Sequence, residues 1–136
     1  MLATLGMRQL GSEAAAAREA RLEIAKTVGA DHPAYEDLRL VVSELVTNAF
    51  RHGPPDGRIT LHIRREEGDF LIEVADDGTS RPRPILRAPD PEVNLPEKGL
   101  GLWNVHVITL GRWGFQDRRG LPGCVVWARI PAHPHR

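Results

Sequence analysis

The sequence predicts an α+β fold, a two-layer α/β sandwich in which helices cover one face of a mixed, mostly antiparallel sheet. Apolar side chains at helical spacing dominate residues 13–53, apolar and polar side chains alternate within 59–74, and two further strands are expected around 112–116 and 123–130. Helices, a hairpin, a loop, a helix and a second hairpin in this order are typical of that architecture. The length of 136 residues suits one domain over residues 1–136, with its core over about 10–130.

The amino-terminal part predicts a strand and a helix. Residues 1–11 mix apolar and small side chains, which favours a short edge strand. Ser12 is a good cap for a helix that runs from Glu13 to about Val28, and Gly29 ends that helix.

A longer amphipathic helix follows from about Pro33, with Asp31 or His32 at its start. Its apolar side chains recur at i, i+3 and i+4 and predict one buried stripe. The cluster Gly53-Pro54-Pro55-Asp56-Gly57 cannot continue a helix and therefore ends it.

The next segments predict a hairpin and an irregular loop. Side chains alternate over 59–64 and 70–74, across a turn at 67–69, which is typical of two antiparallel strands. Residues 77–98 contain several prolines and no periodicity, so we expect a long loop there, and such loops are usually functional or disordered.

The carboxyl-terminal part predicts a short helix and a second hairpin. The helix is expected over about residues 102–110, and the strands around 112–116 and 123–130. The tail 131–136 is expected to fray.

The long helix also carries polar groups where packing alone does not require them. Glu44 and Asn48 lie one turn apart on a stripe beside the apolar one. Arg51 and His52 follow Glu44 by about two turns, which brings both close to the same line. A carboxylate, a carboxamide and a basic pair are therefore expected on one side of this helix.

The second strand of the first hairpin ends in a carboxylate. Residues 70, 72 and 74 are expected to face the core, and the same parity carries on to Asp76. Burying a carboxylate without a partner is costly, so Asp76 needs a donor from the protein or from a ligand. Gly78 would let a ligand lie flat on the backbone, whereas Asp77 has the opposite parity and is expected to be solvated.

The segment Lys98-Gly99-Leu100-Gly101-Leu102 predicts an anion site. It opens a helix directly after the loop, so unpaired backbone amides, two of them on glycine, can approach a phosphate closely. Asn104 stands where a dinucleotide-binding motif has its third glycine, and no P-loop motif occurs, so this segment alone has low specificity.

Charge and composition exclude several classes of function. Eighteen basic and eighteen acidic residues give a formal net charge of zero, so no global field holds the chain on nucleic acid or on an anionic membrane. Cys124 is the single cysteine, which excludes an intrachain disulfide, and it is expected to be a small buried side chain. Neither a secretion signal nor a run of about 18 apolar residues is present, so we expect a cytoplasmic protein.

Each polar feature also has a purely structural interpretation. Glu44 and Asn48 can belong to an ordinary solvated helix face, and Asp76 can cap a turn. Gly99 and Gly101 can simply permit close packing. Each of these interpretations is reasonable singly, and less so for all three features together.

The histidines and tryptophans are expected to have no special role. His133 and His135 are poorly spaced for a metal site and belong to the tail. Trp103, Trp113 and Trp127 are expected to be partly buried core side chains.

Three separated motifs, Glu44-x-x-x-Asn48, Asp76-x-Gly78 and Gly99-x-Gly101, resemble in their order the N, G1 and G2 boxes of the GHKL ATP-binding superfamily, which has the Bergerat fold. The similarity covers about residues 10–130, and three boxes in order are far more specific than any one of them. The short chain and its Asn-Ala-x-x-His-Gly and Arg-Trp-Gly strings look most like bacterial anti-sigma factor serine/threonine kinases.

The resemblance implies a role for each site residue. Asn48 would coordinate Mg²⁺ through its amide oxygen, and Glu44 would be the general base that takes a proton from a serine hydroxyl or from water. Asp76 would accept a hydrogen bond from the exocyclic amine of adenine. The other residues implied in ATP binding are Arg51, His52, Gly78, Lys98, Gly99, Leu100, Gly101 and Leu102.

The implied function is that of a Mg-ATP-binding kinase that phosphorylates an anti-sigma factor antagonist and regulates transcription by partner switching. Its partners would be the antagonist, a sigma factor or both, without direct contact to nucleic acid or membrane. The first helix is a candidate face for a sigma factor or for a homodimer, and the sequence leaves this choice open. Ser80 replaces the second glycine of the G1 box and a proline-rich loop follows, which favours an alternative, a catalytically weak interaction module whose partner binding is set by ATP.

Overall fold

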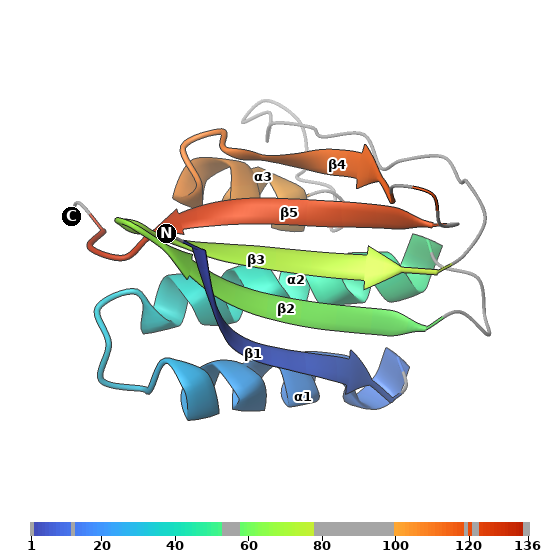
Figure 1. Cartoon of the computed structure of the whole chain (residues 1–136), viewed down its shortest axis with the longest axis horizontal. Coiled ribbons are helices and arrows are strands. Elements are labelled where there is room, and N and C mark those ends of the chain that lie inside the picture. Colours follow the sequence, from blue (N-terminus) through green and yellow to red (C-terminus); the bar gives the residue numbers. More distant parts are fainter. Residues whose placement is uncertain are drawn as a thin grey trace.

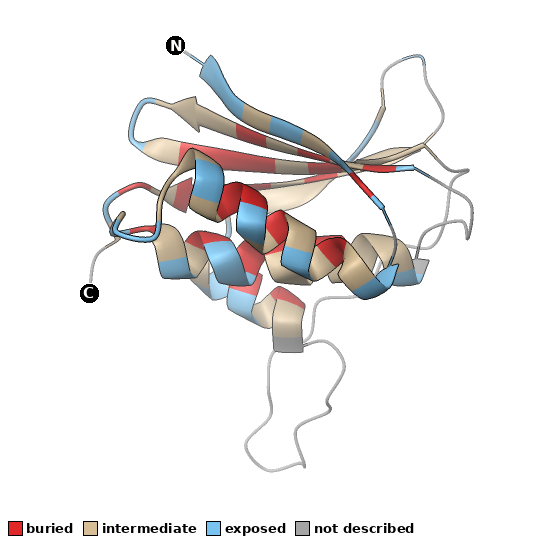
Figure 2. Cartoon of the chain, turned by 90° about the horizontal axis from the view of Figure 1, so that it is seen from below, coloured by how far each residue is buried: buried red, intermediate tan, exposed pale blue. Residues whose placement is uncertain are grey.

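A computed structural model describes residues 2–11, 13–52, 58–77, 100–118, 120 and 123–134. Within these residues five strands form one sheet in the order β1-β2-β3-β5-β4, and every neighbouring pair runs antiparallel. The helices α1, α2 and α3 lie on one face of this sheet (Figures 1 and 2). The predicted α+β sandwich is therefore confirmed.

The elements follow the predicted order, with some shifted ends. The strands are β1 (Leu2–Leu10), β2 (Ile59–Glu66), β3 (Asp69–Asp76), β4 (Trp113–Asp117) and β5 (Cys124–Pro131), and the helices are α1 (Glu13–Thr27), α2 (Tyr35–His52) and α3 (Leu100–Ile108).

The predicted limits of α3 were wrong by two residues at each end. Its start lies before Gly101, so this glycine belongs to the helix and does not precede it. Its end comes early because Leu110 has a φ of 57° and Gly111 a φ of 79°, and neither value can continue a right-handed helix.

Local hydrogen bonds define the connection between α1 and α2. Gly29 has a φ of 95° and donates its amide to Ile24 O at 3.3 Å, so the predicted stop of α1 at this glycine is confirmed. His32 Nδ1 accepts a hydrogen bond from the Ala34 amide at 3.0 Å, and His32 O accepts one from the Tyr35 amide at 3.0 Å. Of the two predicted starting residues, His32 therefore makes the hydrogen bonds that lead into α2.

The core lies between the sheet and the helices, where the red segments of Figure 2 gather. α2 packs against β2, β3 and β5 and against both other helices, so it is the central helix of its layer. Each fully buried aliphatic side chain contributes about 1.5–3 kcal/mol to folding. The largest of them are Ile24, Leu38, Leu45, Ile59, Leu61, Ile63, Ile72, Ile130, Val41, Val42, Val46 and Val74.

The described part of the tail is ordered by contacts that the sequence did not indicate. Pro131 is the last residue of β5, and Ala132 is fully buried and donates its amide to Gly68 O at 2.9 Å. The expectation that the chain frays from residue 131 is therefore wrong as far as residue 134. The buried methyl group of Ala132, its hydrogen bond to Gly68 and the stacking of His133 on His32 at 6.3 Å tie this segment to the fold.

The tryptophans are partly buried, as expected, whereas the cysteine lies less deep than expected. Trp113 and Phe115 pack against the core with partly exposed rings, and Trp103 stacks on His106 at 5.3 Å. Trp127 is half-buried, and so is Cys124, which corrects the expectation of a buried thiol.

Candidate functional site

The carboxylate of Glu44 joins α2 to α3. Glu44 is half-buried, and its carboxylate lies over the Cα of Gly101, in the first turn of α3. A methyl group added at position 101 would collide with Glu44 Oε2 and would come within 2.5 Å of Glu44 Cδ. Two motifs far apart in the sequence are therefore in direct contact.

Burial raises the pKa of Glu44 above its ordinary value of 4.5, and the positive charge of Arg51 opposes this rise. The larger cause is burial, because removing water penalises the charged form more than Arg51 stabilises it. A carboxyl group with a raised pKa holds a proton more readily than a solvated one, which suits it to proton transfer.

Asn48 and Arg51 follow Glu44 along α2. Asn48 is half-buried, and Arg51 is exposed but close enough to act on the charge of Glu44. The amide oxygen of Asn48 is a hard ligand of the kind that Mg²⁺ takes. His52 is the last residue of α2, and its side chain lies outside the part that the structure describes.

Asp76 ends β3 at the same end of the sheet as the carboxyl terminus of α2 (Figure 1). The predicted inward parity is confirmed by Phe70, Ile72 and Val74, which are buried, and Asp76 itself is half-buried. Asp77 was expected to be solvated, but its Oδ1 accepts a hydrogen bond of 2.6 Å from the amide of Arg58. Asp77 therefore ties β3 to the start of β2.

Two residues that the sequence did not single out hold the main chain of Asp76. Gly123 has a φ of 110°, and a Cβ there would collide with Asp76 O and lie 2.8 Å from Asp76 C. Arg118 Nη1 donates to Asp76 O at 3.4 Å, and the Arg118 amide donates to Gly123 O at 3.3 Å. Arg118 and Gly123 are thereby packed on the end of β3, and no local pattern indicates such a long-range contact.

The remaining predicted residues are placed in part. Gly78, Lys98 and Gly99 lie outside the described residues, and Leu100 is described only as the first residue of α3. The side chain of Leu102 is 6% exposed and belongs to the core, so it has only its backbone amide to offer a ligand.

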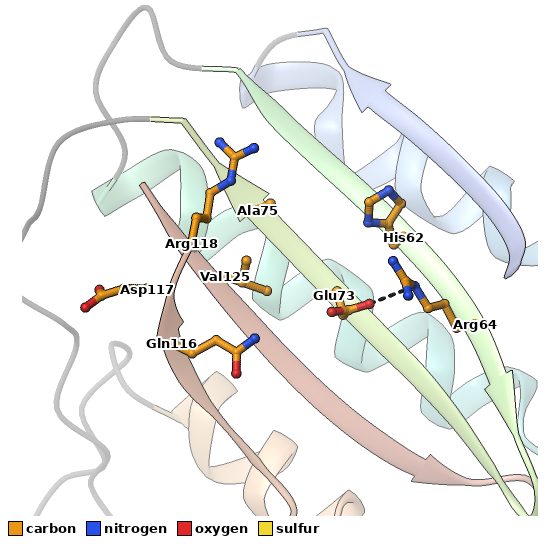
Figure 3. Close-up of a pocket in the computed structure, with 8 residues that line it drawn as sticks. All are labelled: His62, Arg64, Glu73, Ala75, Gln116, Asp117, Arg118 and Val125. Atoms are coloured by element: carbon orange, nitrogen blue, oxygen red, sulfur yellow. Dashed lines mark ion pairs between the residues drawn. The ribbon is translucent and has the colours of Figure 1, made fainter. Parts of the chain in front are cut away.

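A hollow of about 550 Å³ lies on the opposite face of the sheet, away from Glu44 (Figure 3). Arg64 and Glu73 form an ion pair of 2.8 Å there, and burial, followed by Arg64, lowers the pKa of His62 while Glu73 opposes the change. The charges in this hollow are of both signs, so it shows no selectivity for an anion or a cation. Its residues are His62, Arg64, Glu73, Ala75, Gln116, Asp117, Arg118 and Val125.

The donor set of the described residues limits the metal chemistry. No group of three or more histidine, cysteine or acidic side chains gathers in the described ranges in a way that could hold an ion. A metal carried largely by phosphates, with one amide oxygen from Asn48, fits this composition, because Mg²⁺ in nucleotide sites uses few protein ligands. Among the described helices, none is long and apolar enough to cross a membrane.

Comparison with known proteins gives a family and several relatives. A family model described as a histidine kinase-like ATPase domain matches residues 9–109. Over 60 residues the chain is 40% identical to a serine-protein kinase RsbW of Listeria innocua, a match that covers 42% of this chain and 38% of that protein. A serine-protein kinase RsbW of Listeria monocytogenes matches to the same extent.

A third relative matches over a longer stretch. Over 94 residues the chain is 30% identical to a serine-protein kinase RsbW of Bacillus mycoides, which covers 62% of this chain and 59% of that protein. The chain thus spans between 38% and 59% of the length of these curated relatives.

Proposed function

The chain belongs to the histidine kinase-like ATPase domain family, and on this premise we propose that it is a Mg-ATP-dependent serine/threonine protein kinase of the anti-sigma factor type. Support comes from the motif order, from the match over residues 9–109 and from relatives whose names state serine-protein kinase.

The observation that carries the proposal is the position of Glu44. Its half-buried carboxylate has a raised pKa, which suits a general base. It lies on the first turn of α3, and the unpaired amides of a helix start suit phosphate groups. A group for proton transfer and a group for phosphate binding are therefore adjacent.

We assign the roles of the side chains from the family resemblance. Bound Mg²⁺ would offset the negative charge of the phosphates, and Asn48 is the residue that would hold it. Glu44 takes the proton of a serine or threonine hydroxyl on the partner while that oxygen bonds to the γ-phosphorus of ATP and the bond to ADP breaks. Asp76 accepts a hydrogen bond from the adenine amine.

The proposed partners are proteins. An anti-sigma factor antagonist supplies the hydroxyl group, and a sigma factor is the second partner in a switching mechanism that operates in the cytoplasm. The formal net charge of zero supports a protein partner over nucleic acid, because it provides no sequence-independent attraction to phosphate backbones.

A second candidate is the catalytically weak module, in which ATP only sets the shape presented to a partner. Ser80 in the G1 box and the proline-rich segment after it favour this candidate. It predicts ATP binding without phosphate transfer at a useful rate.

Glu44→Ala separates the two candidates. The kinase proposal expects Mg-ATP affinity within about threefold of the parent protein and a fall of at least about 100-fold in phosphate transfer to a purified antagonist encoded by a neighbouring gene. Glu36→Ala is a matched control, because Glu36 lies on the same helix with a side chain 69% exposed. Absence of any transfer by the parent protein would reject the kinase proposal, and retained ATP binding would then support the module.

A further inference from the structure

The contact between Glu44 and Gly101 has a consequence beyond joining two helices. The space where residue 101 would carry a side chain is filled by the Glu44 carboxylate, with Cδ at 2.5 Å and Oε1 at 3.2 Å from the position of a Cβ. Real Cβ contacts are not this short. By contrast, nothing lies within 4 Å of the corresponding position at Gly68.

Backbone conformation does not explain a glycine at position 101. The described glycines with positive φ are Gly29, Gly111, Gly120 and Gly123, and Gly101 lies within the helix α3. Glycine is one of the least favourable residues inside a helix, and alanine is the most favourable. The close approach of the Glu44 carboxylate supplies the reason for glycine here.

We propose that Gly101 is a positioning residue for Glu44: because it has no side chain, it seats the carboxylate of the general base on the first turn of α3. This inference rests on the proposed kinase function and goes beyond the contribution of the Gly101 amide to phosphate binding. If the inference holds, the Gly99-x-Gly101 motif contributes to proton transfer as well as to phosphate binding.

The burial of Glu44 agrees with this positioning role of Gly101. The carboxylate is half-buried, and this burial is the larger cause of its raised pKa. If position 101 carried a methyl group, the carboxylate would have to move away from its place over α3, because the collision involves the flexible end of the Glu44 side chain. The base would then be misplaced although it is still present.

Gly101→Ala isolates this role. Alanine keeps the backbone amide at position 101, so a contact from that amide to phosphate is preserved, and only the space over the Cα is lost. In the presence of Glu44 the new methyl group must displace the flexible end of that side chain, so we expect Gly101→Ala to shift the Tm less favourably than in a protein without the Glu44 side chain. In a Glu44→Ala background the same change should leave the Tm unchanged or raise it, because the collision is gone and alanine favours the helix.

Gly68→Ala is the matched control, since the position is open. It should give the same small change in Tm in both backgrounds. Additive effects of Gly101→Ala and Glu44→Ala on the Tm would overturn the inference, and this measurement needs neither ATP nor a partner.

Kinetics test the catalytic consequence. For phosphate transfer to the antagonist, Gly101→Ala should lower kcat by about tenfold or more and leave KM for ATP within about threefold. Glu44→Asp shortens the side chain by one methylene, so in that background Gly101→Ala should change kcat by less than about threefold.

The outcomes separate the two proposals. A raised KM for ATP with an unchanged kcat would show that Gly101 acts only through phosphate, and would overturn the inference while the kinase function stands. A parent protein that binds ATP but transfers no phosphate would reject the kinase function itself. Non-additive effects of the changes at Gly101 and Glu44 on both the Tm and kcat would support the proposed positioning of Glu44 by Gly101.

Discussion

Gly123 packs on the main-chain carbonyl of Asp76, across the two neighbouring strands β3 and β5. The glycine is required twice over, by its φ of 110° and by the absence of room for a Cβ beside Asp76 C and Asp77 Cα, at 2.8 and 3.0 Å. The main chain of the candidate adenine-binding residue is therefore placed by a glycine that lies far from it in the sequence.

Gly123→Ala is expected to displace the end of β3. The strain of a positive φ and the collision with Asp76 should lower the free energy of unfolding by about 2–4 kcal/mol and weaken ATP binding about tenfold or more. Urea denaturation and calorimetric titration measure the two effects. Gly120→Ala is the control, because Gly120 has a φ of 67° and open space; an equal loss in both variants would contradict the role of the contact.

Asp76→Asn should weaken ATP binding by about 1–3 kcal/mol, because it removes a charged acceptor while keeping the shape of the side chain. Calorimetry with Mg-ATP measures the change in affinity. Asp77→Asn is the matched control, since Asp77 accepts a hydrogen bond from the Arg58 amide at 2.6 Å and is expected to affect stability more than binding. If ATP affinity were unchanged in the Asp76 variant, the adenine assignment would be wrong.

Asn48→Ala should abolish the dependence of ATP affinity on Mg²⁺, because the amide oxygen is the one metal ligand assigned to the protein. The expected result is the same affinity with excess Mg²⁺ as with a chelator. The Tm should not fall, since alanine is the better helix former at this half-buried position. Thr47→Ala, the neighbouring residue of α2, is expected to keep the Mg²⁺ effect, and its loss there would show that the effect is indirect.

Acid should weaken the fold through His32. Its pKa is lowered from 6.5 by burial, then by the charges of Arg65 and His133. The folded state therefore binds this proton less readily than the unfolded state, so the contribution of His32 is complete above about pH 6.5 and is lost as the pH falls below it. Protonation also removes the acceptor for the Ala34 amide, a hydrogen bond worth about 1 kcal/mol.

His32→Asn replaces the imidazole by an amide, which keeps a hydrogen-bond acceptor for the Ala34 amide but does not titrate. Its Tm should fall less between pH 7.5 and pH 5.5 than that of the parent, as measured by calorimetry or circular dichroism. The pKa of His62 is lowered as well, so a His62→Asn change in the same background should flatten the remaining dependence. If the pH dependence of the Tm were unchanged in His32→Asn, protonation of His32 would be excluded as its cause.

Much of the fold could be predicted because its determinants are local. The buried stripe of α2, the alternation along β2 and β3 and the stop at Gly29 each follow from a few neighbouring residues. The end of the sheet was less predictable. Ala132 is ordered by a bond to Gly68, a residue far away in the chain, and no short window of sequence contains both.

The candidate site divides in the same way. The residue types and their order along the chain predicted an ATP-binding family, and the match over residues 9–109 confirms it. The sequence also predicted that Glu44 stands out from the apolar stripe of its helix. It could not show that the carboxylate would lie on Gly101, or that Gly123 would hold Asp76.

The amino-acid sequence by itself determined the elements, their order and the family, because helical and strand periodicity and the spacing of short motifs are properties of neighbouring residues. Only the tertiary structure decided which groups touch. The position of Glu44 on α3 and the contacts of Arg118 and Gly123 with Asp76 both depend on how α2, α3 and the sheet pack. Packing brings together residues that are remote in the chain. The role of a glycine such as Gly101 can therefore be recognised only when the structure shows which atoms occupy the space that a side chain would take.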